Sequence, residues 1–200
     1  TQGFTGEYIP EEIKWPTTEN PTPSEPWFAY SEAEAAKYFP RGIIDHRGLG
    51  MPALVAGTSE DVMRNVCTLL DQAEATSAVT IEVRASDIVS YAFELPGERF
   101  LLAFWQDGFV SESSLGLTAT VQVTLPAPIE GSALLTGYDV VYGFQQELLG
   151  TTQGRGLTVP DVVIRDHPLT IRVAPLRRVY LPLALRASHH HTPGDGTEGR

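Results

Sequence analysis

Hydrophobic and polar positions change their spacing at about residue 76, and before that point the spacing fits two helices. In the segment 31–50, "SEAEAAKYFPRGIIDHRGLG", Ser31 and Glu34 stand three residues apart, as in a capping box. Apolar side chains then recur at helical spacing at Ala35, Tyr38, Phe39 and Ile43. We therefore expect a helix that begins at Ser31.

The segment 58–75, "TSEDVMRNVCTLLDQAEA", predicts a second helix. Thr58 or Ser59 can cap it, and the two acidic residues that follow favour the positive end of the helix dipole. One face is apolar, with Val62, Val66, Leu69, Leu70 and Ala73. Cys67 falls within this apolar pattern, and we expect it to pack as a small hydrophobic residue.

Two short segments next to these helices have the composition of strands. Residues 1–9 are β-prone and their apolar run stops near Glu7, whereas residues 51–57 form a continuous apolar run, which is typical of a strand covered on both faces. Five prolines within residues 10–27 predict a long loop between the first strand and the first helix. The order strand, helix, strand, helix indicates parallel strands with crossover helices.

After residue 76 the apolar residues follow a period of two or form short continuous runs. Pro96-Gly97 predicts a hairpin turn, and the residues of 117–125 alternate between an apolar and a polar face. Predicted strands cover 80–84, 88–95, 99–105, 117–125, 133–141, 144–150, 156–164 and 169–175. Short antiparallel strands at this spacing predict a β-sandwich.

These patterns predict a fold of two classes in one chain, α/β followed by all-β. Residues 1–75 would form the α/β part and residues 76–185 a β-sandwich accessory domain. Residues 186–200 are polar and rich in glycine, and we expect a disordered tail there.

Charge and composition limit the classes of partner. The net charge of −11 disfavours binding to nucleic acids and to anionic membranes, so a neutral ligand fits better. No apolar run is long enough for a membrane-spanning helix, and a soluble protein is expected, cytoplasmic or secreted. A single cysteine excludes an intrachain disulfide framework and a zinc site built from cysteines.

Glu7 is the candidate catalytic residue, because it stands where the first apolar run ends. Strands hold side chains rigidly at their ends, and a carboxylate there can act as the nucleophile of a retaining glycosidase. Tyr8, Trp15 and Trp27 follow it and offer aromatic faces to a sugar ring. A solvated glutamate at a strand edge is the plainer alternative. Glu19 is a rival nucleophile, although the prolines beside it disfavour a strand.

Other residues with reactive side chains have structural interpretations. Asp166-His167-Pro168 predicts a turn in which Asp166 accepts backbone hydrogen bonds. Trp105 ends an apolar strand and is expected in the core. The histidines 189–191 could bind a metal, but a polar tail favours a flexible chain end.

Several segments of the chain resemble a known family of enzymes. "GEYIPEEIKW", "WFAYSEAEAAKYFPRGIIDHRGLGM" and "MRNVCTLLDQA" resemble the final two βα units of a (β/α)8 TIM-barrel glycoside hydrolase of the retaining clan with two catalytic glutamates. "YAFELPGERFLLAFWQDG" and "LTGYDVVYGFQQELLGTTQGRGLTVPDVVIRDHPLTIRV" resemble the β-sandwich that follows the barrel in bacterial members. The resemblance spans roughly residues 1–175. Its more specific parts are 30–50 and the ending of the sandwich, in which an Asp-Val pair, a Gln-Glu-Leu triplet and an Asp-His-Pro turn recur.

This resemblance implies that the chain is the C-terminal fragment of such an enzyme, with Glu7 as nucleophile and a carbohydrate as substrate. The general acid/base would belong to the missing N-terminal barrel portion, so the fragment is expected to be inactive alone. The chemistry requires no cofactor and no metal. The alternatives are a non-catalytic carbohydrate-binding or adhesion module, which a row of exposed aromatic residues would favour, and a structural or interaction protein.

Overall fold

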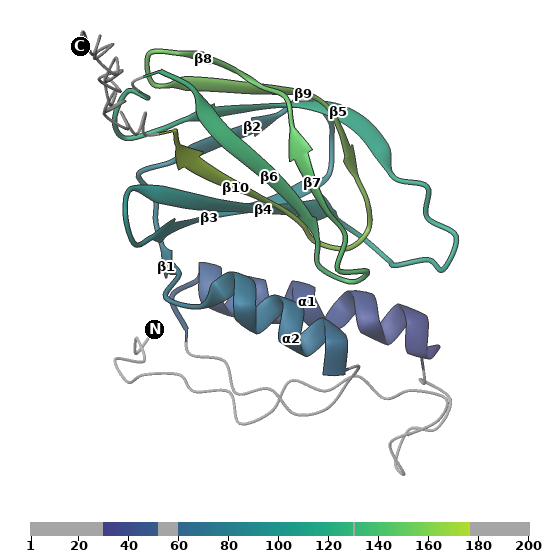
Figure 1. Ribbon diagram of the computed structural model, residues 1–200. Helices are drawn as coiled ribbons and strands as arrows, with labels where there is room; N and C mark the ends of the chain where they lie inside the picture. The colour runs from purple at the N-terminus through teal and green to yellow at the C-terminus, as the bar shows by residue number, and fades with distance from the viewer. Residues whose placement is uncertain (1–29, 52–59, 130, 177–200) are drawn as a thin grey trace, which may run out of the picture.

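The structure is a computed structural model, which describes residues 30–51, 60–129 and 131–176. Helix α1 is Glu32–Gly48 and helix α2 is Glu60–Leu70. The strands in these ranges are β1 Glu74–Ala75, β2 Thr80–Val83, β3 Ile88–Leu95, β4 Arg99–Gln106, β5 Leu117–Thr124, β6 Ala133–Asp139, β7 Gln145–Leu148, β8 Thr151–Gln153, β9 Gly156–Ile164 and β10 Leu169–Pro175. Figure 1 shows two layers of strands with both helices lying side by side beneath them.

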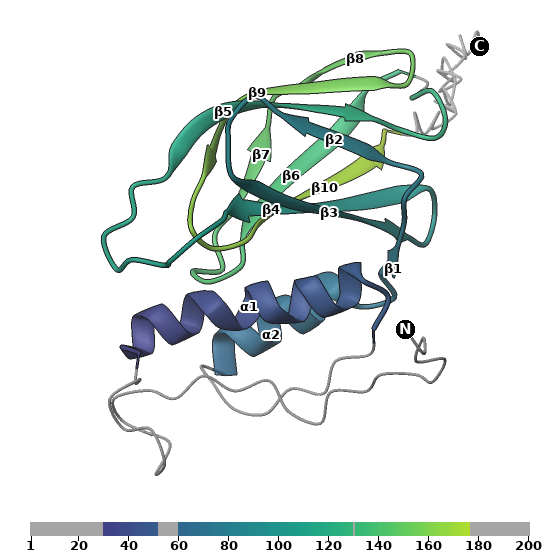
Figure 2. The same ribbon diagram turned by 180° about the vertical axis from the view of Figure 1, so that it is seen from behind.

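The strands form two antiparallel sheets that face each other. The first sheet has the order β1-β3-β4-β10-β6-β7, and the second has the order β2-β5-β9-β8. Inward-facing side chains of both sheets make one core, which includes Leu102 and Phe104 of β4, Val121 of β5 and Ile164 of β9. The described strands therefore pack as a β-sandwich, which is also seen from behind in Figure 2.

The alternation predicted for 117–125 is confirmed. Ala119, Val121 and Val123 are buried in the core between the sheets, whereas Thr118 and Thr124 are exposed. The predicted hairpin between β3 and β4 is also present, and Leu95 pairs with Arg99 across its turn. Gly97 in this turn has a φ of +80°, a conformation that glycine adopts without the steric cost that a Cβ brings.

Both predicted helices are present, and α1 begins as its sequence indicates. The Ser31 hydroxyl accepts a hydrogen bond from the backbone N–H of Glu34 (3.2 Å), and the Glu34 carboxylate accepts one from the backbone N–H of Ser31 (3.0 Å). This reciprocal pair is the capping box, which satisfies two backbone donors that a helix start leaves without partners.

The helices cover the outer face of the six-stranded sheet, as Figures 1 and 2 both show. A second core fills the space between them, and it joins Phe39 of α1 and Val66 of α2 to Phe93, Leu101 and Trp105 of the sheet. Trp105 is 2% exposed, so its predicted place in the core is confirmed. Neither described helix is long and apolar enough to cross a bilayer.

The predicted fold class, in which the last two βα units of a TIM barrel precede the sandwich, is wrong. The described residues are mostly antiparallel strands with only two helices, and all of their strand pairs are antiparallel. The apolar faces of α1 and α2 contact the sheet of the sandwich rather than parallel strands. The strands predicted at 1–9 and 51–57 lie outside the described residues. Helical spacing predicted that these faces are buried, but it does not identify what covers them.

The prediction for Cys67 is also wrong, because this side chain is exposed. The buried residues of α2 are Val62, Val66, Leu69 and Leu70. Cys67 comes directly after Val66, and neighbouring residues in a helix point about 100° apart, so it leaves the buried face. Its sulfur lies 3.7 Å from the sulfur of Met63 on the helix surface.

Candidate functional site

The residues predicted for catalysis and sugar binding all lie outside the described part of the chain. These residues are Glu7, Tyr8, Trp15 and Trp27, together with the rival Glu19 and the histidines 189–191. Their roles therefore stay predictions.

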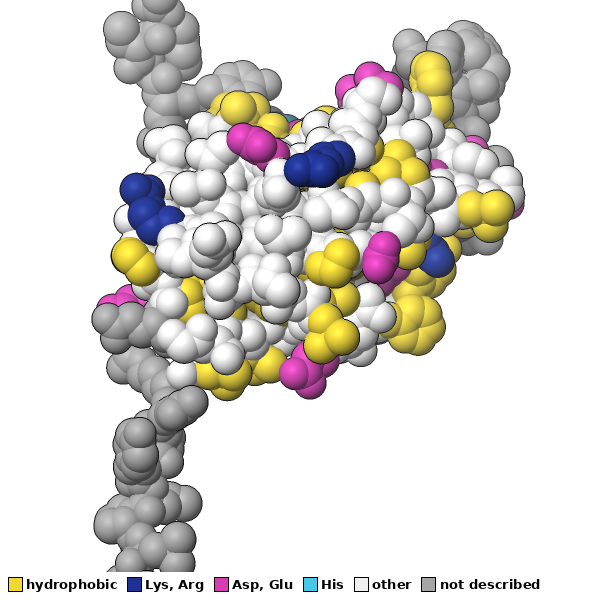
Figure 3. Space-filling view, turned by 90° about the horizontal axis from the view of Figure 1, so that it is seen from above, with side chains coloured by type: hydrophobic (Ala, Val, Ile, Leu, Met, Phe, Trp, Pro, Cys, Tyr) yellow, Lys and Arg dark blue, Asp and Glu magenta, His cyan; other side chains and the backbone are white. Residues whose placement is uncertain are grey.

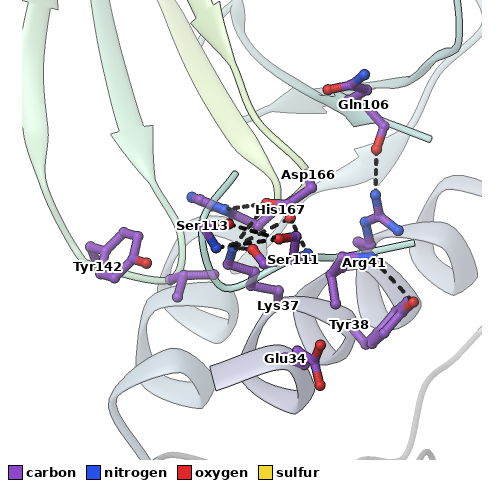
Figure 4. Close-up of polar contacts among 12 residues, drawn as sticks. Glu34, Lys37, Tyr38, Arg41, Gln106, Ser111, Ser113, Tyr142, Asp166 and His167 are labelled. Carbon is purple, nitrogen blue, oxygen red and sulfur yellow. Dashed lines mark hydrogen bonds and ion pairs between the residues drawn. The ribbon is translucent and has the colours of Figure 1, made fainter. Parts of the chain in front are cut away.

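A buried ion pair between α1 and the β9–β10 connection forms the centre of the described polar site. The ammonium of Lys37 lies 3.1 Å from Oδ1 and 3.3 Å from Oδ2 of Asp166, and the two side chains are 3% and 6% exposed. Lys37 also donates a hydrogen bond to the carbonyl oxygen of Ser111, and the backbone N–H of Ser111 donates to Asp166 (2.6 Å). Figure 4 shows these groups converging above α1.

His167 extends this pair into a chain of four side chains. Its Nδ1 lies 3.2 Å from Oδ1 of Asp166, and its Nε2 lies 3.0 Å from Oδ2 of Asp139 at the end of β6. Both ring nitrogens face a carboxylate, and only the doubly protonated ring donates from both at once. Lys37, Asp166, His167 and Asp139 therefore form one continuous chain of polar contacts, and we refer to them below as the charged network.

The charged network lowers the pKa of both of its carboxyl groups. Burial alone raises the pKa of Asp166, but the backbone N–H of Ser111 and the hydrogen bonds from Lys37 and His167 outweigh it. Burial acts in the same way on Asp139, and the hydrogen bond and positive charge of His167 again lower the pKa below its usual value. Both carboxylates are therefore held in the ionised form.

The geometry of the charged network fits a structural link better than a catalytic centre. Both nitrogens of His167 are already directed at carboxylates, so the ring has none left to activate a nucleophile. The Ser111 hydroxyl instead lies 3.3 Å from the hydroxyl of Ser113. The sequence prediction that Asp166 accepts a backbone hydrogen bond in this turn is confirmed by its contact with Ser111.

Arg41, one helical turn after Lys37, makes a second link between α1 and the sandwich. This side chain is 7% exposed, and it donates to the carbonyl oxygens of Gly108 (2.7 Å) and Gln106. Its guanidinium also lies over the rings of Tyr38 (5.7 Å) and Trp105 (6.0 Å). Two buried cations on one helix therefore both bind the β4–β5 connection, Lys37 at Ser111 and Arg41 at Gly108.

Sequence reasoning missed Lys37, Arg41 and Asp139 as members of a site. One signal was available, because Lys37 and Arg41 are spaced i, i+4 among the apolar positions of α1. A cation within an apolar helical face needs a buried acceptor. The residues near Lys37 and Arg41 in the sequence do not show which group that acceptor is.

The described residues lack a cluster of side chains that suits a metal ion. They contain no group of three or more His, Cys, Asp or Glu side chains that could hold a metal ion. On the outer face of the four-stranded sheet, seen from above in Figure 3, hydrophobic side chains are scattered among uncharged polar ones.

A scan of the chain against protein-family models finds no match, and a search of the curated proteins finds no similar sequence.

The lowered pKa values predict that the protein loses stability in acid. Each depressed carboxyl contributes stability that is complete above its unfolded pKa and is lost as the pH falls through the lower folded value. Asp45 acts in the opposite direction, because burial raises its pKa, and it offsets part of this loss. We expect the free energy of unfolding, measured with urea, to fall as the pH drops below about 4.

The variant Asp166→Asn tests the origin of this pH dependence. It should be less stable at neutral pH and should lose less stability between about pH 5 and pH 3, because one depressed carboxyl is absent. Asp161→Asn is the matched control, since Asp161 is exposed and should keep the slope of the parent protein. Equal slopes in Asp166→Asn and the parent would contradict the role given to Asp166.

Proposed function

We propose that the chain belongs to a retaining glycoside hydrolase, in which the sandwich with its two helices is an accessory unit and Glu7 supplies the nucleophile. The proposal rests on the resemblance of the sequence to such enzymes. In their mechanism, a carboxylate attacks the anomeric carbon and forms a glycosyl ester, which water then hydrolyses. A second carboxyl group about 5 Å away acts as acid and base, and the proposal assigns it to another part of the enzyme.

One observation supports this proposal more than the others. The more specific parts of the resemblance include the α1 segment and, far from it in the sequence, the Asp-His-Pro turn. The buried pair of Lys37 with Asp166 connects these two segments. A buried ion pair of this kind fits an accessory unit that must hold its helices in one position.

The second core supports the same role. Ile44 and Phe39 of α1 pack with Leu101 and Trp105 of β4, so the helices are attached by a hydrophobic interface as well as by charges. An accessory domain that supports a catalytic domain must itself be rigid. A close-packed interface between the helices and the sheet provides this rigidity.

Mechanism-based labelling of the complete protein that contains this chain tests the proposal. The probes are 2,4-dinitrophenyl 2-deoxy-2-fluoro β-glycosides of glucose, galactose and xylose, whose good leaving group does not need an acid catalyst. We expect a stable glycosyl adduct, which peptide mass spectrometry locates on Glu7. Glu7→Gln should abolish the adduct, whereas Glu19→Gln should keep it. An adduct on Glu19, or none with any probe, would overturn the assignment.

A further inference from the structure

A groove beside the charged network has features that no role described above uses. It lies between the β6–β7 hairpin and the end of β9, and its volume is about 320 Å³. Its lining includes Gly137, Phe144, Gln145, Gln146 and Arg165. This volume falls at the lower end of the range for small-molecule sites.

Two aromatic rings are exposed at the groove. Phe144 lines it with 73% of its surface exposed, and Tyr142, beside it, is 51% exposed. Their ring centroids are 6.3 Å apart and their planes differ by 26°, so the Tyr142 ring stacks against that of Phe144. Other large aromatic residues of the described part, such as Phe93, Phe104 and Trp105, are buried in the cores. An exposed aromatic pair indicates a surface that meets a ligand.

The turn that carries these rings is held firmly from several sides. Oδ1 of Asp139 accepts the backbone N–H groups of Val141 (3.1 Å) and Tyr142 (2.9 Å). The side-chain amide of Asn65 on α2 donates to the carbonyl oxygen of Val140 (3.0 Å). The ring of His167 meets the Tyr142 ring edge to face, with centroids 5.5 Å apart, and Figure 4 shows these two residues near each other. Such a surface loses little conformational entropy when a ligand binds.

The polar groups of the groove suit hydroxyl groups. Gln146 shares its face of the sheet with Gly137, is exposed and makes no side-chain hydrogen bond with other described residues, so its amide can both donate and accept. Gly137 lies opposite Gln146 in the neighbouring strand, and a Cβ there would come within 3.1 Å of Leu148 and 3.6 Å of Gln146. Glycine at this position therefore lets the side chains of Leu148 and Gln146 lie directly over the strand.

The charges of the groove favour a neutral ligand. Arg165 lines the groove, and its positive charge is attracted to the carboxylate of Asp139, which lines the same groove. The chain as a whole carries a net charge of −11, which repels phosphates and other anions. A pyranose ring has an apolar C–H face for the exposed ring of Phe144 and hydroxyl groups for the amide of Gln146. We propose that this groove is a non-catalytic binding site for a neutral saccharide.

Titration with soluble neutral oligosaccharides tests the site without reference to Glu7. The probes are cellotetraose, xylotetraose, mannotetraose and maltotetraose at millimolar concentrations, and the readout is the ¹H–¹⁵N NMR spectrum of the labelled protein. We expect one probe or more to shift the backbone signals of 137–146 and the side-chain amide signals of Gln146. Phe144→Ala should weaken that binding by about tenfold.

Two control variants show whether the saccharide binds at the groove. Phe109→Ala removes a ring that is 92% exposed on another loop and should leave the affinity unchanged. Glu7→Gln should also bind as the parent does, so a failure of the proposed catalytic function would not affect this test. The absence of any shift with all four probes would overturn the proposal. Equal losses of affinity in Phe144→Ala and Phe109→Ala would overturn it as well.

Discussion

Lys37→Met is expected to lower the free energy of unfolding by about 3–5 kcal/mol, the cost of breaking a buried ion pair by removing one partner. Methionine keeps most of the apolar stem of lysine, so the change removes mainly the charge. Asp166 would remain 6% exposed without its cation, and the carbonyl oxygen of Ser111 would lose a donor. Urea denaturation followed by circular dichroism measures the effect.

Arg64→Ala is the matched control for this prediction. Arg64 makes ion pairs with Glu60 and Asp61 on α2, but these side chains are largely exposed. Exposed pairs contribute about 0–1 kcal/mol, so the control should change stability little. A cycle with Asp166→Asn and the double variant should give a coupling energy of about 0.5–3 kcal/mol. Equal costs for Lys37→Met and Arg64→Ala would show that the charged network does not hold α1.

Phe39→Ala is expected to be as damaging, with a loss of about 3–5 kcal/mol, as is usual for a fully buried phenylalanine. Phe39 is 0% exposed and belongs to the core between the helices and the six-stranded sheet. Alanine would leave a cavity there that the rigid sheet cannot close. The same urea measurement gives the change in unfolding free energy from the midpoint and the slope.

Phe109→Ala serves as the control for this effect, because it removes the same side chain from an exposed position. It should stay within about 0.5 kcal/mol of the parent protein. If Phe39→Ala were equally mild, the helices would not be part of the folded unit. Retained strand content together with lost helix content at intermediate urea would support the same conclusion.

The local elements of this fold could be predicted from the sequence. Ser31 and Glu34 define the start of α1, and the alternation in 117–125 defines which face of β5 is buried. The strand predicted at 88–95 has the bounds of β3. Capping, period and turn chemistry depend on near neighbours in the chain, and for this reason a single sequence reveals them.

The surface to which each element attaches could not be read in the same way. Strand β4 does indicate that something covers the sheet from outside. Its sequence "RFLLAFW" is continuously apolar after Arg99, as in a strand covered on both faces. In the structure, Leu102 and Phe104 face the other sheet, whereas Leu101 and Trp105 face the helices. The order of the elements and the resemblance instead suggest parallel strands as the partners of α1 and α2.

The candidate site was less accessible to sequence reasoning than the fold. The sequence presents Asp166 and His167 only as a turn, and their main partner, Lys37, is 129 residues away from Asp166. No periodic pattern links positions at that separation. Phe144 was missed as an exposed aromatic residue, because it opens a segment that the sequence predicts as a strand.

The exposure of Cys67 has a practical consequence. It is the single cysteine of the chain and lies on α2 away from the packed face. A maleimide dye would therefore attach at one known position without entering either core. Its emission during acidification would report directly when the helical layer separates from the strands.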